Sequence, residues 1–160
     1  MCYRRRDELR KPETSGDCNR IVNPGWDHYD SFTFAPAVRR GDLLFISGIT
    51  ATDAGGDIIG RGDIVAQTRH IFEKLRCVLE AAGAGPGDIV KTTDYIVDTD
   101  NYRQTAQVRR EFFGERFPAA TGVVVKRLLR PDALIEIDAI AVIPGIKRDS
   151  DQPGDIEGPA

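Results

Sequence analysis

Two carboxylates of the chain lie inside stretches that otherwise read as strands, where a charged side chain needs a partner or a function. Glu136 stands between two isoleucines, and Asp94 stands in a run of apolar and neutral residues. Two carboxylates at one cleft, with pKa values pushed apart by their surroundings, could act as general acid and general base. The structural alternatives are an ion pair at a subunit interface for Glu136, and for Asp94 a buried pair with Lys91, Arg127 or a neighbouring subunit's arginine. The buried pair is the favoured interpretation of Asp94, which is kept as the second candidate catalytic residue.

Smaller polar groups lie at two further places along the chain. Ser47 precedes Gly48 at the end of an apolar run, where its hydroxyl could face a site or bond to nearby backbone. Thr121 and Gly122 follow the turn that begins at Phe117, and the threonine hydroxyl could donate a hydrogen bond from that turn. A threonine at the start of a strand also needs no function. Both interpretations stay open.

Histidines and arginines offer fewer possibilities. The two histidines, His28 and His70, show no metal-ligand spacing, so we expect no catalytic metal and no cofactor. His28 and Tyr29 precede the first strand and could fold over the site as a lid. Arg109 and Arg110 on a predicted helix could reach an anionic substrate across a subunit boundary, although such pairs more often form a solvated helix face.

The composition is that of an ordinary globular protein and argues against nucleic-acid and membrane partners. The 160 residues are 41% hydrophobic and 29% charged, with a formal net charge of −3, and the pI is about 5.4. Nucleic-acid binding normally requires a basic face, and a membrane span requires roughly 18 consecutive apolar residues. The chain shows neither, and its three cysteines form no disulfide or metal pattern. We therefore expect a soluble, cytoplasmic protein.

The apolar periodicity predicts the elements that would position these side chains. Two runs at residues 32–38 and 43–49, separated by a turn, indicate a hairpin. A helix begins at an Asp63 N-cap and ends at Ala82-Gly83. The remaining predicted elements are a short edge strand at 58–59, a strand at 89–97, a helix from about 100 to 118, and strands at 123–128 and 134–143.

This order predicts an α+β sandwich in which two helices cover one face of a single mixed sheet. In the last strand, apolar residues alternate with mixed ones, so that one face is apolar and the other is not. The apolar set is Ile135, Ile137, Ala139 and Ala141, and the mixed set is Leu134, Glu136, Asp138 and Ile140. An uncovered mixed face is typical of an oligomer interface or of the wall of a site. Oligomerisation is therefore predicted.

Both ends of the chain differ in composition from this body. Residues 1–23 and 147–160 are rich in charged residues, proline and glycine and poor in apolar side chains. Such segments cannot bury enough apolar surface to offset the entropy of ordering, and they are typical of disordered tails. One folded domain is therefore expected over residues 24–146.

Several short motifs in fixed order resemble the Rid family, also called YjgF. They are Ser47-Gly48, Gln67, Ala81-Ala82-Gly83, the run Gly87–Thr93, Phe112-Phe113, Phe117-Pro118-Ala119 and the run Ile135–Ala141. The resemblance covers about residues 32–143 with little gapping. It implies a chorismate-mutase-like fold and a homotrimer with active sites in the clefts between subunits. It also implies hydrolysis of reactive imines and enamines, such as those derived from 2-aminoacrylate, to a keto acid and ammonia.

The resemblance implies a role for one residue and the loss of others. Glu136 matches the glutamate that positions the attacking water, which favours the functional interpretation of this carboxylate. The arginine that grips the substrate carboxylate is replaced by Ala120, a tyrosine of the first strand by Phe34, and an asparagine of the second helix by Ala106. The candidate substrate-binding positions are Ser47, Phe34, Ala106, Ala120, Thr121 and Gly122.

These losses change the substrate that the site should hold, because a guanidinium offers a fixed fork of donors to a carboxylate and alanine offers none. We expect hydrolytic deamination of a small imine, enamine or related carbonyl metabolite, with Glu136 positioning or activating water. The pocket should be wider and more apolar, and should disfavour a simple 2-aminoacrylate-type acid. The alternatives are a tautomerase or other proton-transfer enzyme on a larger carbonyl substrate, and a non-catalytic trimer that binds a small molecule. Nucleic-acid cleavage, which some family names record, is disfavoured by the acidic pI.

Overall fold

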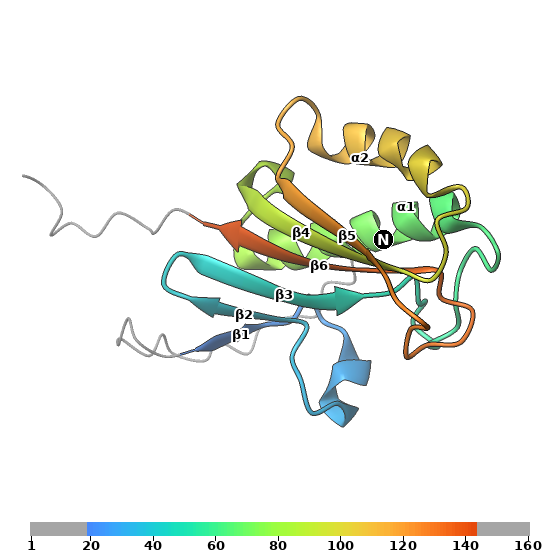
Figure 1. Cartoon of the computed structure of the whole chain (residues 1–160). Coiled ribbons are helices and arrows are strands. Elements are labelled where there is room, and N and C mark those ends of the chain that lie inside the picture. Colours follow the sequence, from blue (N-terminus) through green and yellow to red (C-terminus); the bar gives the residue numbers. More distant parts are fainter. Residues whose placement is uncertain (1–18, 144–160) are drawn as a thin grey trace, which may run out of the picture.

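The computed structural model describes residues 19–143 and shows one mixed sheet with two α-helices (Figure 1). The strands are β1 (Arg20–Val22), β2 (Ala37–Arg40), β3 (Leu43–Ile49), β4 (Ile89–Ile96), β5 (Ala119–Val124) and β6 (Ile135–Val142). The α-helices are α1 (Ile64–Ala82) and α2 (Thr105–Phe113), and the short 3₁₀ helices are η1 (Asp27–Ser31), η2 (Pro86–Asp88) and η3 (Tyr102–Gln104).

The six strands form one sheet in the order β1-β2-β3-β6-β4-β5. β4 and β5 are parallel, and every other neighbouring pair is antiparallel. Figure 1 shows both α-helices on the same face of this sheet. The predicted arrangement of two helices over one face of a mixed sheet is confirmed.

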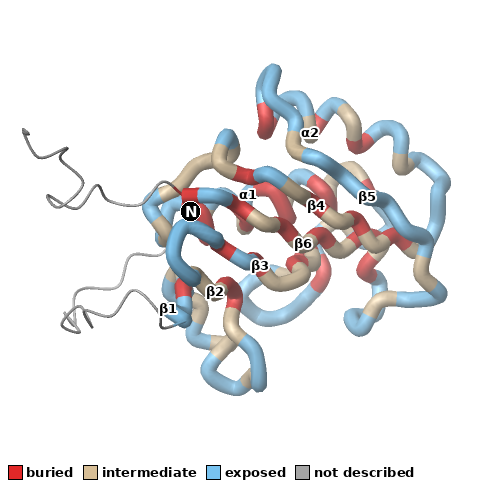
Figure 2. The backbone as a smooth tube through the Cα atoms, turned by 60° about the vertical axis from the view of Figure 1, so that its left-hand side comes forward, coloured by how far each residue is buried: buried red, intermediate tan, exposed pale blue. Residues whose placement is uncertain are grey.

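The helix-covered face of the sheet carries the hydrophobic core. Along β6, Ile135, Ile137 and Ala139 are buried, whereas Glu136 and Asp138 between them are partly exposed on the other face. Figure 2 shows this alternation of buried and partly exposed residues along the central strands. Successive side chains of a strand point to opposite faces, so the two-residue period of the sequence translates directly into one core face and one open face.

α1 begins and ends where local signals in the sequence place it. The Asp63 carboxylate accepts hydrogen bonds from the backbone N–H groups of Val65 and Ala66, at 2.9 and 3.0 Å. These bonds satisfy two donors that the first turn of a helix leaves without partners. After the last turn, Gly83 adopts a φ of 75°, which costs glycine little and ends the helix. The predicted helix is confirmed at both ends.

Strand boundaries differ from the prediction at three places. β2 begins at Ala37 rather than at residue 32, since Pro36 has no N–H to donate to a ladder. β5 (Ala119–Val124) begins directly after Pro118, four residues earlier than the predicted strand at 123–128, and residues 125–134 form a loop. The predicted edge strand at 58–59 is reduced to an isolated bridge between Thr52 and Ile58.

Two further corrections concern the N-terminal boundary and the cysteines. β1 pairs with β2 between Arg20 and Arg39, so the folded domain begins inside the segment predicted as a tail. The tail predictions for residues 1–18 and 147–160, and the end of the domain at 146, lie outside the described residues. Cys77 is disulfide-bonded, whereas the sequence predicts no disulfide. No helix within residues 19–143 has the length and apolar character needed to cross a bilayer.

Candidate active site

Glu136 lies in the middle of β6 on the face of the sheet that the helices leave open. Its carboxylate lies directly against Gly48, which has no side chain. A Cβ built on that glycine would lie only 2.0 Å from Glu136 Oε1. The β3–β6 register shifts at this point, between Ile46 and Ile49, as it does where a strand admits one additional residue in a bulge. The bulge and the missing side chain together make room for the carboxylate.

We expect Gly48→Ala to destabilise the fold and to displace Glu136. The added methyl group would lie 2.0 Å from Oε1, and overpacking of this kind costs about 1–3 kcal/mol. Gly87→Ala is the matched control, because nothing lies within 4 Å of a Cβ built on Gly87. Urea unfolding of both variants checks the prediction, and equal free energies of unfolding for the two would contradict it.

The surroundings of Glu136 favour its protonated form more than water does. Burial is the main cause that raises the pKa of this carboxyl, and the negative charge of Asp138 raises it further. Asp138 lies two positions along on the same face and accepts a hydrogen bond from the Tyr95 hydroxyl at 2.9 Å. Among residues 19–143, no cation forms an ion pair with Glu136. A carboxylate with a raised pKa and no paired cation is a stronger proton acceptor than an ordinary one, which suits it to act as a general base.

Asp138→Asn should lower the pKa of Glu136. The substitution removes a negative charge that disfavours a second one nearby, while the amide oxygen can still accept from Tyr95. Because Glu136 is ionised above its pKa, the variant should keep this charge down to a lower pH than the unaltered protein does. An NMR titration of the Glu136 carboxyl carbon measures the midpoint. A midpoint that stays the same or rises would rule out the influence assigned to Asp138.

An aromatic cluster borders Glu136 and includes Tyr29, Phe32 and Phe34. Tyr29 contacts the two phenylalanines edge to face, with ring centroids 5.2 and 5.7 Å apart. Burial raises the pKa of the Tyr29 hydroxyl, and the charge of Glu136 raises it further. His28 and Tyr29, which the sequence offered as a lid, lie in η1. Tyr29 is within electrostatic reach of the Glu136 carboxylate.

A shallow pocket with a volume of about 370 Å³ adjoins this cluster. Its lining consists of Ile21, Asn23, Tyr29, Asp30, Phe32, Thr33, Phe34, Ala35 and Pro36. Glu136 is not among these residues, so we assign the chemistry to the open sheet face and not to this pocket. In the described part of the chain, no three His, Cys, Asp or Glu side chains are grouped so that they could hold a metal ion.

One group of predicted site residues lies around Glu136. Phe34 belongs to the aromatic cluster and is 54% exposed. Ser47 precedes the glycine on which Glu136 packs, but its hydroxyl donates to the Ala35 carbonyl at 2.7 Å. That bond is the backbone interaction given above as the structural alternative for this serine.

A second group lies at the edge of the sheet, along β5 and α2. Ala120, Thr121 and Gly122 are exposed on β5, and Ala106 lies on α2. β4 separates β5 from β6, and the β4–β5 register pairs Gly122 with Asp94 on the helix-covered face. A single chain therefore does not bring this second group together with Glu136.

Asp94 does not join Glu136 either. The β4–β6 register sets Asp94 opposite Ile137 and Tyr95 opposite Glu136, so the two carboxylates project from opposite faces of the sheet. The predicted acid–base pair of Asp94 and Glu136 is therefore wrong. Strand alternation could not reveal this from the sequence, because each residue's face depends on the register between the two strands.

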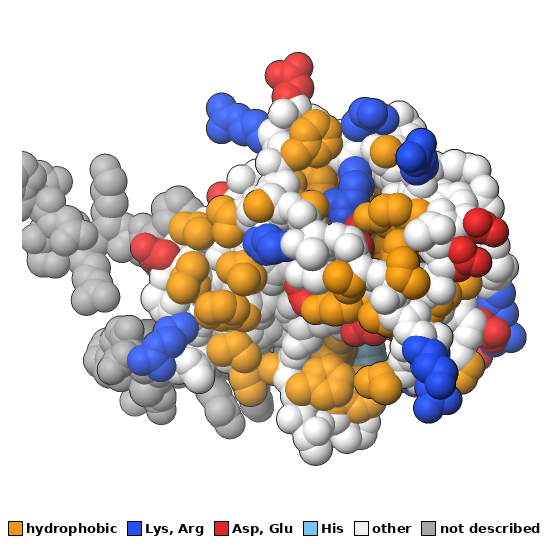
Figure 3. Space-filling model, viewed as in Figure 1, with side chains coloured by type: hydrophobic (Ala, Val, Ile, Leu, Met, Phe, Trp, Pro, Cys, Tyr) orange, Lys and Arg blue, Asp and Glu red, His pale blue; other side chains and the backbone are white. Residues whose placement is uncertain are grey.

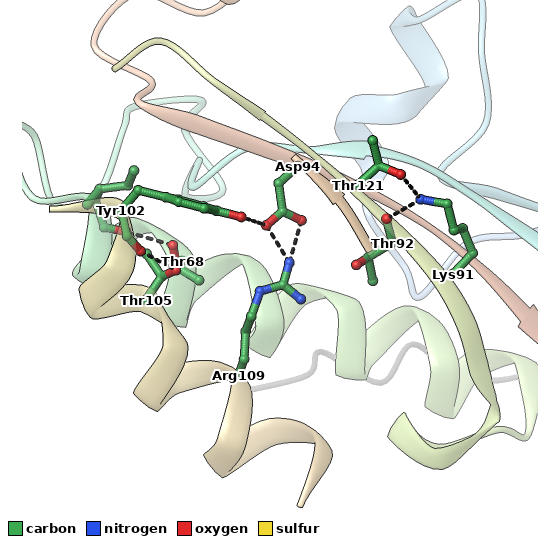
Figure 4. Close-up of polar contacts among 9 residues, drawn as sticks. Thr68, Lys91, Thr92, Asp94, Tyr102, Thr105, Arg109 and Thr121 are labelled. Atoms are coloured by element: carbon green, nitrogen blue, oxygen red, sulfur yellow. Dashed lines mark hydrogen bonds and ion pairs between the residues drawn. The ribbon is translucent and has the colours of Figure 1, made fainter. Parts of the chain in front are cut away.

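Asp94 instead belongs to a buried cluster between β4 and α2 (Figure 4). Its side chain is 1% exposed and forms an ion pair with the Arg109 guanidinium. The Tyr102 hydroxyl donates to the same carboxylate at 2.8 Å, and burial followed by this bond raises the pKa of Tyr102 to about 12. The buried pair predicted for Asp94 exists, but its partner is Arg109 rather than Lys91 or Arg127. Arg109 is correspondingly not part of a solvated helix face.

Two residues near Glu136 were not singled out from the sequence. Asp138 shares the face of Glu136 by strand alternation, a signal that the sequence does contain. Arg130 lies in the β5–β6 loop, and its charge acts on Tyr29. Only the following Pro131 marks a turn there, so no local pattern predicts that this arginine lies near the aromatic cluster.

Comparison with known proteins shows the family to which this architecture belongs. A family model described as Endoribonuclease L-PSP matches residues 30–143. The solved structure of YyfA from Yersinia pestis, a Rid family protein of unknown function, matches with a TM-score of 0.71 and 29% sequence identity. The match covers 79% of this chain and 100% of that chain. The chain belongs to the Rid (YjgF) family. Its fold is the chorismate-mutase-like fold of such proteins.

Relatives of this Rid family member include proteins named for RutC. A RutC family protein of Pyrococcus horikoshii is 41% identical over 108 residues, covering 68% of this chain and 85% of the relative. The 3-aminoacrylate deaminase RutC of Acinetobacter baylyi is 36% identical over 108 residues, with the same coverage of 68% and 85%.

Proposed function

We propose that this Rid family member hydrolyses a small imine or enamine to the corresponding carbonyl compound and ammonia, with Glu136 as the general base. The observation that carries the proposal is the Glu136 carboxylate, which is partly buried on the open sheet face with a raised pKa. The similarity to a relative named 3-aminoacrylate deaminase supports the same class of reaction.

The reaction needs a positioned water, a base for its proton and a protonated leaving nitrogen. Glu136 removes a proton from water as the water oxygen bonds to the carbon of a protonated imine. The resulting amino alcohol takes up a proton on nitrogen, its C–N bond breaks, and the hydroxyl proton is lost as the carbonyl forms. One protonated imine and one water thus give one carbonyl compound and one ammonium ion. An enamine must first take up a proton on carbon to give the imine.

The active unit is proposed to be a homotrimer with sites between subunits. The two groups of candidate residues are separated within one chain, and a second copy could bring its β5 edge to the Glu136 face of the first. Hydrophobic side chains gather on this open face over β3 and β6 (Figure 3). The partly exposed ones are Leu43, Phe45 and Val142, with exposures of 40–46%. Exposed apolar patches of this kind typically mark interaction surfaces.

The position of Ala120 shapes the substrate preference that we propose. Alanine supplies no donor for a carboxylate beside the reactive carbon, so simple 2-aminoacrylate-type acids should be poor substrates. The substrate preference is tested by the rate of ammonia release from a panel of imines generated in solution, with the unaltered protein and with Ala120→Arg. The oligomeric state is tested by sedimentation equilibrium. We expect a mass about three times that of the 17.6 kDa chain. We also expect Ala120→Arg to release ammonia faster than the unaltered protein only from imines that carry an adjacent carboxylate. A monomer, or release no faster than in buffer with every imine, would refute the proposal.

A further inference from the structure

Arg130 begins a defined turn in the loop between β5 and β6. The Ala133 N–H donates to the Arg130 carbonyl at 3.3 Å. Pro131 occupies the second position of the turn, and Asp132 at the third has a φ of 64°. Proline followed by a residue with positive φ is the pattern of a type II turn. The backbone from which the arginine side chain projects is therefore constrained.

Gln67 of α1 fastens this loop to the body of the domain. The glutamine is fully buried, and its side-chain amide donates to the Asp132 carbonyl at 2.9 Å and accepts from the Leu134 N–H at 2.8 Å. A third bond joins it to the Gly60 carbonyl at 3.1 Å. A binding residue needs support of this kind, because a site on a mobile loop loses affinity to the entropy of ordering.

The Arg130 guanidinium faces the aromatic cluster beside Glu136. It lies 5.9 Å from the centroid of the Phe32 ring. Tyr29 lies within reach of both charges: after burial, Glu136 raises the pKa of its hydroxyl and Arg130 opposes that shift. Among residues 19–143, Arg130 and Glu136 form no ion pair with each other.

Arg130 is the cation of this neighbourhood that is available to a ligand. Among residues 19–143 it forms no ion pair, and Asp132 in the same turn is engaged by Arg61 at 3.7 Å. The other nearby cation, Lys74, already donates to the carbonyls of Thr50 and Thr52 at 3.1 Å and to the Thr52 hydroxyl at 2.7 Å. A guanidinium left without a carboxylate is suited to bind a planar oxyanion through two parallel hydrogen bonds.

We propose that Arg130 binds a carboxylate of the substrate, at a place displaced from Ala120, so that the carboxylate is joined to the reactive carbon through a spacer. This inference rests on the proposed function for the location of the reactive carbon at Glu136. The substrate class is an imine or enamine whose acid group stands two or more bonds from the carbon that water attacks. Its body lies against the rings of Tyr29 and Phe32.

The test uses binding, so that it does not depend on turnover. Three stable ketones serve as probes of the carbonyl product: 4-oxopentanoate with a spaced carboxylate, 4-oxopentanamide without charge, and 2-oxopentanoate with an adjacent carboxylate. Binding to the full-length protein is followed by isothermal titration calorimetry. The fluorescence of Trp26, the only tryptophan of the chain, gives a second readout, since its ring stacks with Tyr29 at 5.7 Å.

We expect 4-oxopentanoate to bind at least about tenfold more tightly than 4-oxopentanamide and 2-oxopentanoate, as for a charge-assisted pair. Arg130→Gln should abolish this preference. Arg130→Lys should retain only part of it, since lysine keeps the positive charge but lacks the two parallel donors of the guanidinium. Arg127→Gln is the matched control from the same loop and should retain the full preference. Equal affinities for the three ketones, no binding of 4-oxopentanoate, or an unchanged preference in Arg130→Gln would overturn the proposal. Preference without any imine turnover would instead refute the proposed hydrolysis while leaving this role of Arg130 standing.

Discussion

Glu136→Gln is expected to lower kcat for imine hydrolysis by about 10²–10⁴-fold, the usual contribution of a positioned general base. Glutamine has nearly the same shape, so it can still pack on Gly48 and orient a water, but it cannot accept the proton. The carboxylate is the group that carries the proposed chemistry, because its pKa is raised by burial and by Asp138. The affinity for 4-oxopentanoate should change little, since the acid group is assigned to Arg130.

The control for this experiment is Glu73→Gln on α1. Glu73 is also a glutamate, but its side chain is 65% exposed and it projects from the helix layer, on the other face of the sheet from Glu136. Steady-state rates and urea unfolding of both variants separate catalysis from stability. If Glu136→Gln retained the kcat of the unaltered protein, the carboxylate would be structural and another base would have to be found.

Arg109→Met is expected to destabilise the fold by about 3–5 kcal/mol, the cost of leaving one member of a buried ion pair without its partner. Asp94 is 1% exposed, and Arg109 and Tyr102 supply the donors that hold its carboxylate. Methionine preserves much of the length of the side chain, which also lies over the Phe72 ring with the guanidinium carbon 5.6 Å from its centroid. The predicted loss therefore comes mainly from the carboxylate that remains buried.

Arg110→Met is the matched control, because Arg110 is the exposed neighbour on the same helix. It should change the free energy of unfolding by less than about 0.5 kcal/mol, as surface substitutions usually do. Asp94→Asn combined with Arg109→Met should recover part of the loss, since the asparagine is neutral and its oxygen can still accept from Tyr102. Urea unfolding of the four proteins gives the values. Equal stabilities for Arg109→Met and Arg110→Met would show that the pair contributes nothing.

Features fixed by a few adjacent residues could be predicted from the sequence. The ends of α1 follow from the hydrogen-bonding side chain of Asp63 and from the positive φ of Gly83, both of which act within one turn. The open and buried faces of β6 follow from alternation around Glu136. The layer arrangement follows from the order of the elements and from two amphipathic helices.

Features that depend on pairing between distant segments could not be predicted. β5 begins at Ala119 because it pairs with β4 from Lys91 onward, and no local signal marks that start apart from Pro118. Asp94 meets Arg109, fifteen residues further along the chain, because the register of β4 and the position of α2 bring the two side chains together. The bulge that leaves space for the Glu136 carboxylate beside Gly48 likewise depends on the pairing of β3 with β6. The catalytic candidate was therefore identified from the sequence, whereas its surroundings were not.

The most direct test of the central claim is the initial rate of ammonia release, before the imine reaches a steady level, from imines generated by an amino-acid oxidase (adjacent carboxylate) or by a flavin-dependent amine oxidase (spaced or absent carboxylate). The rate is measured at rising concentrations of the unaltered protein and of Glu136→Gln. The account predicts a rise in proportion to the unaltered protein and, with the variant, a rate close to that in buffer. Equal rates with both proteins, for imines with adjacent, spaced and absent carboxylates, would contradict the claim that this protein is a Glu136-dependent imine hydrolase.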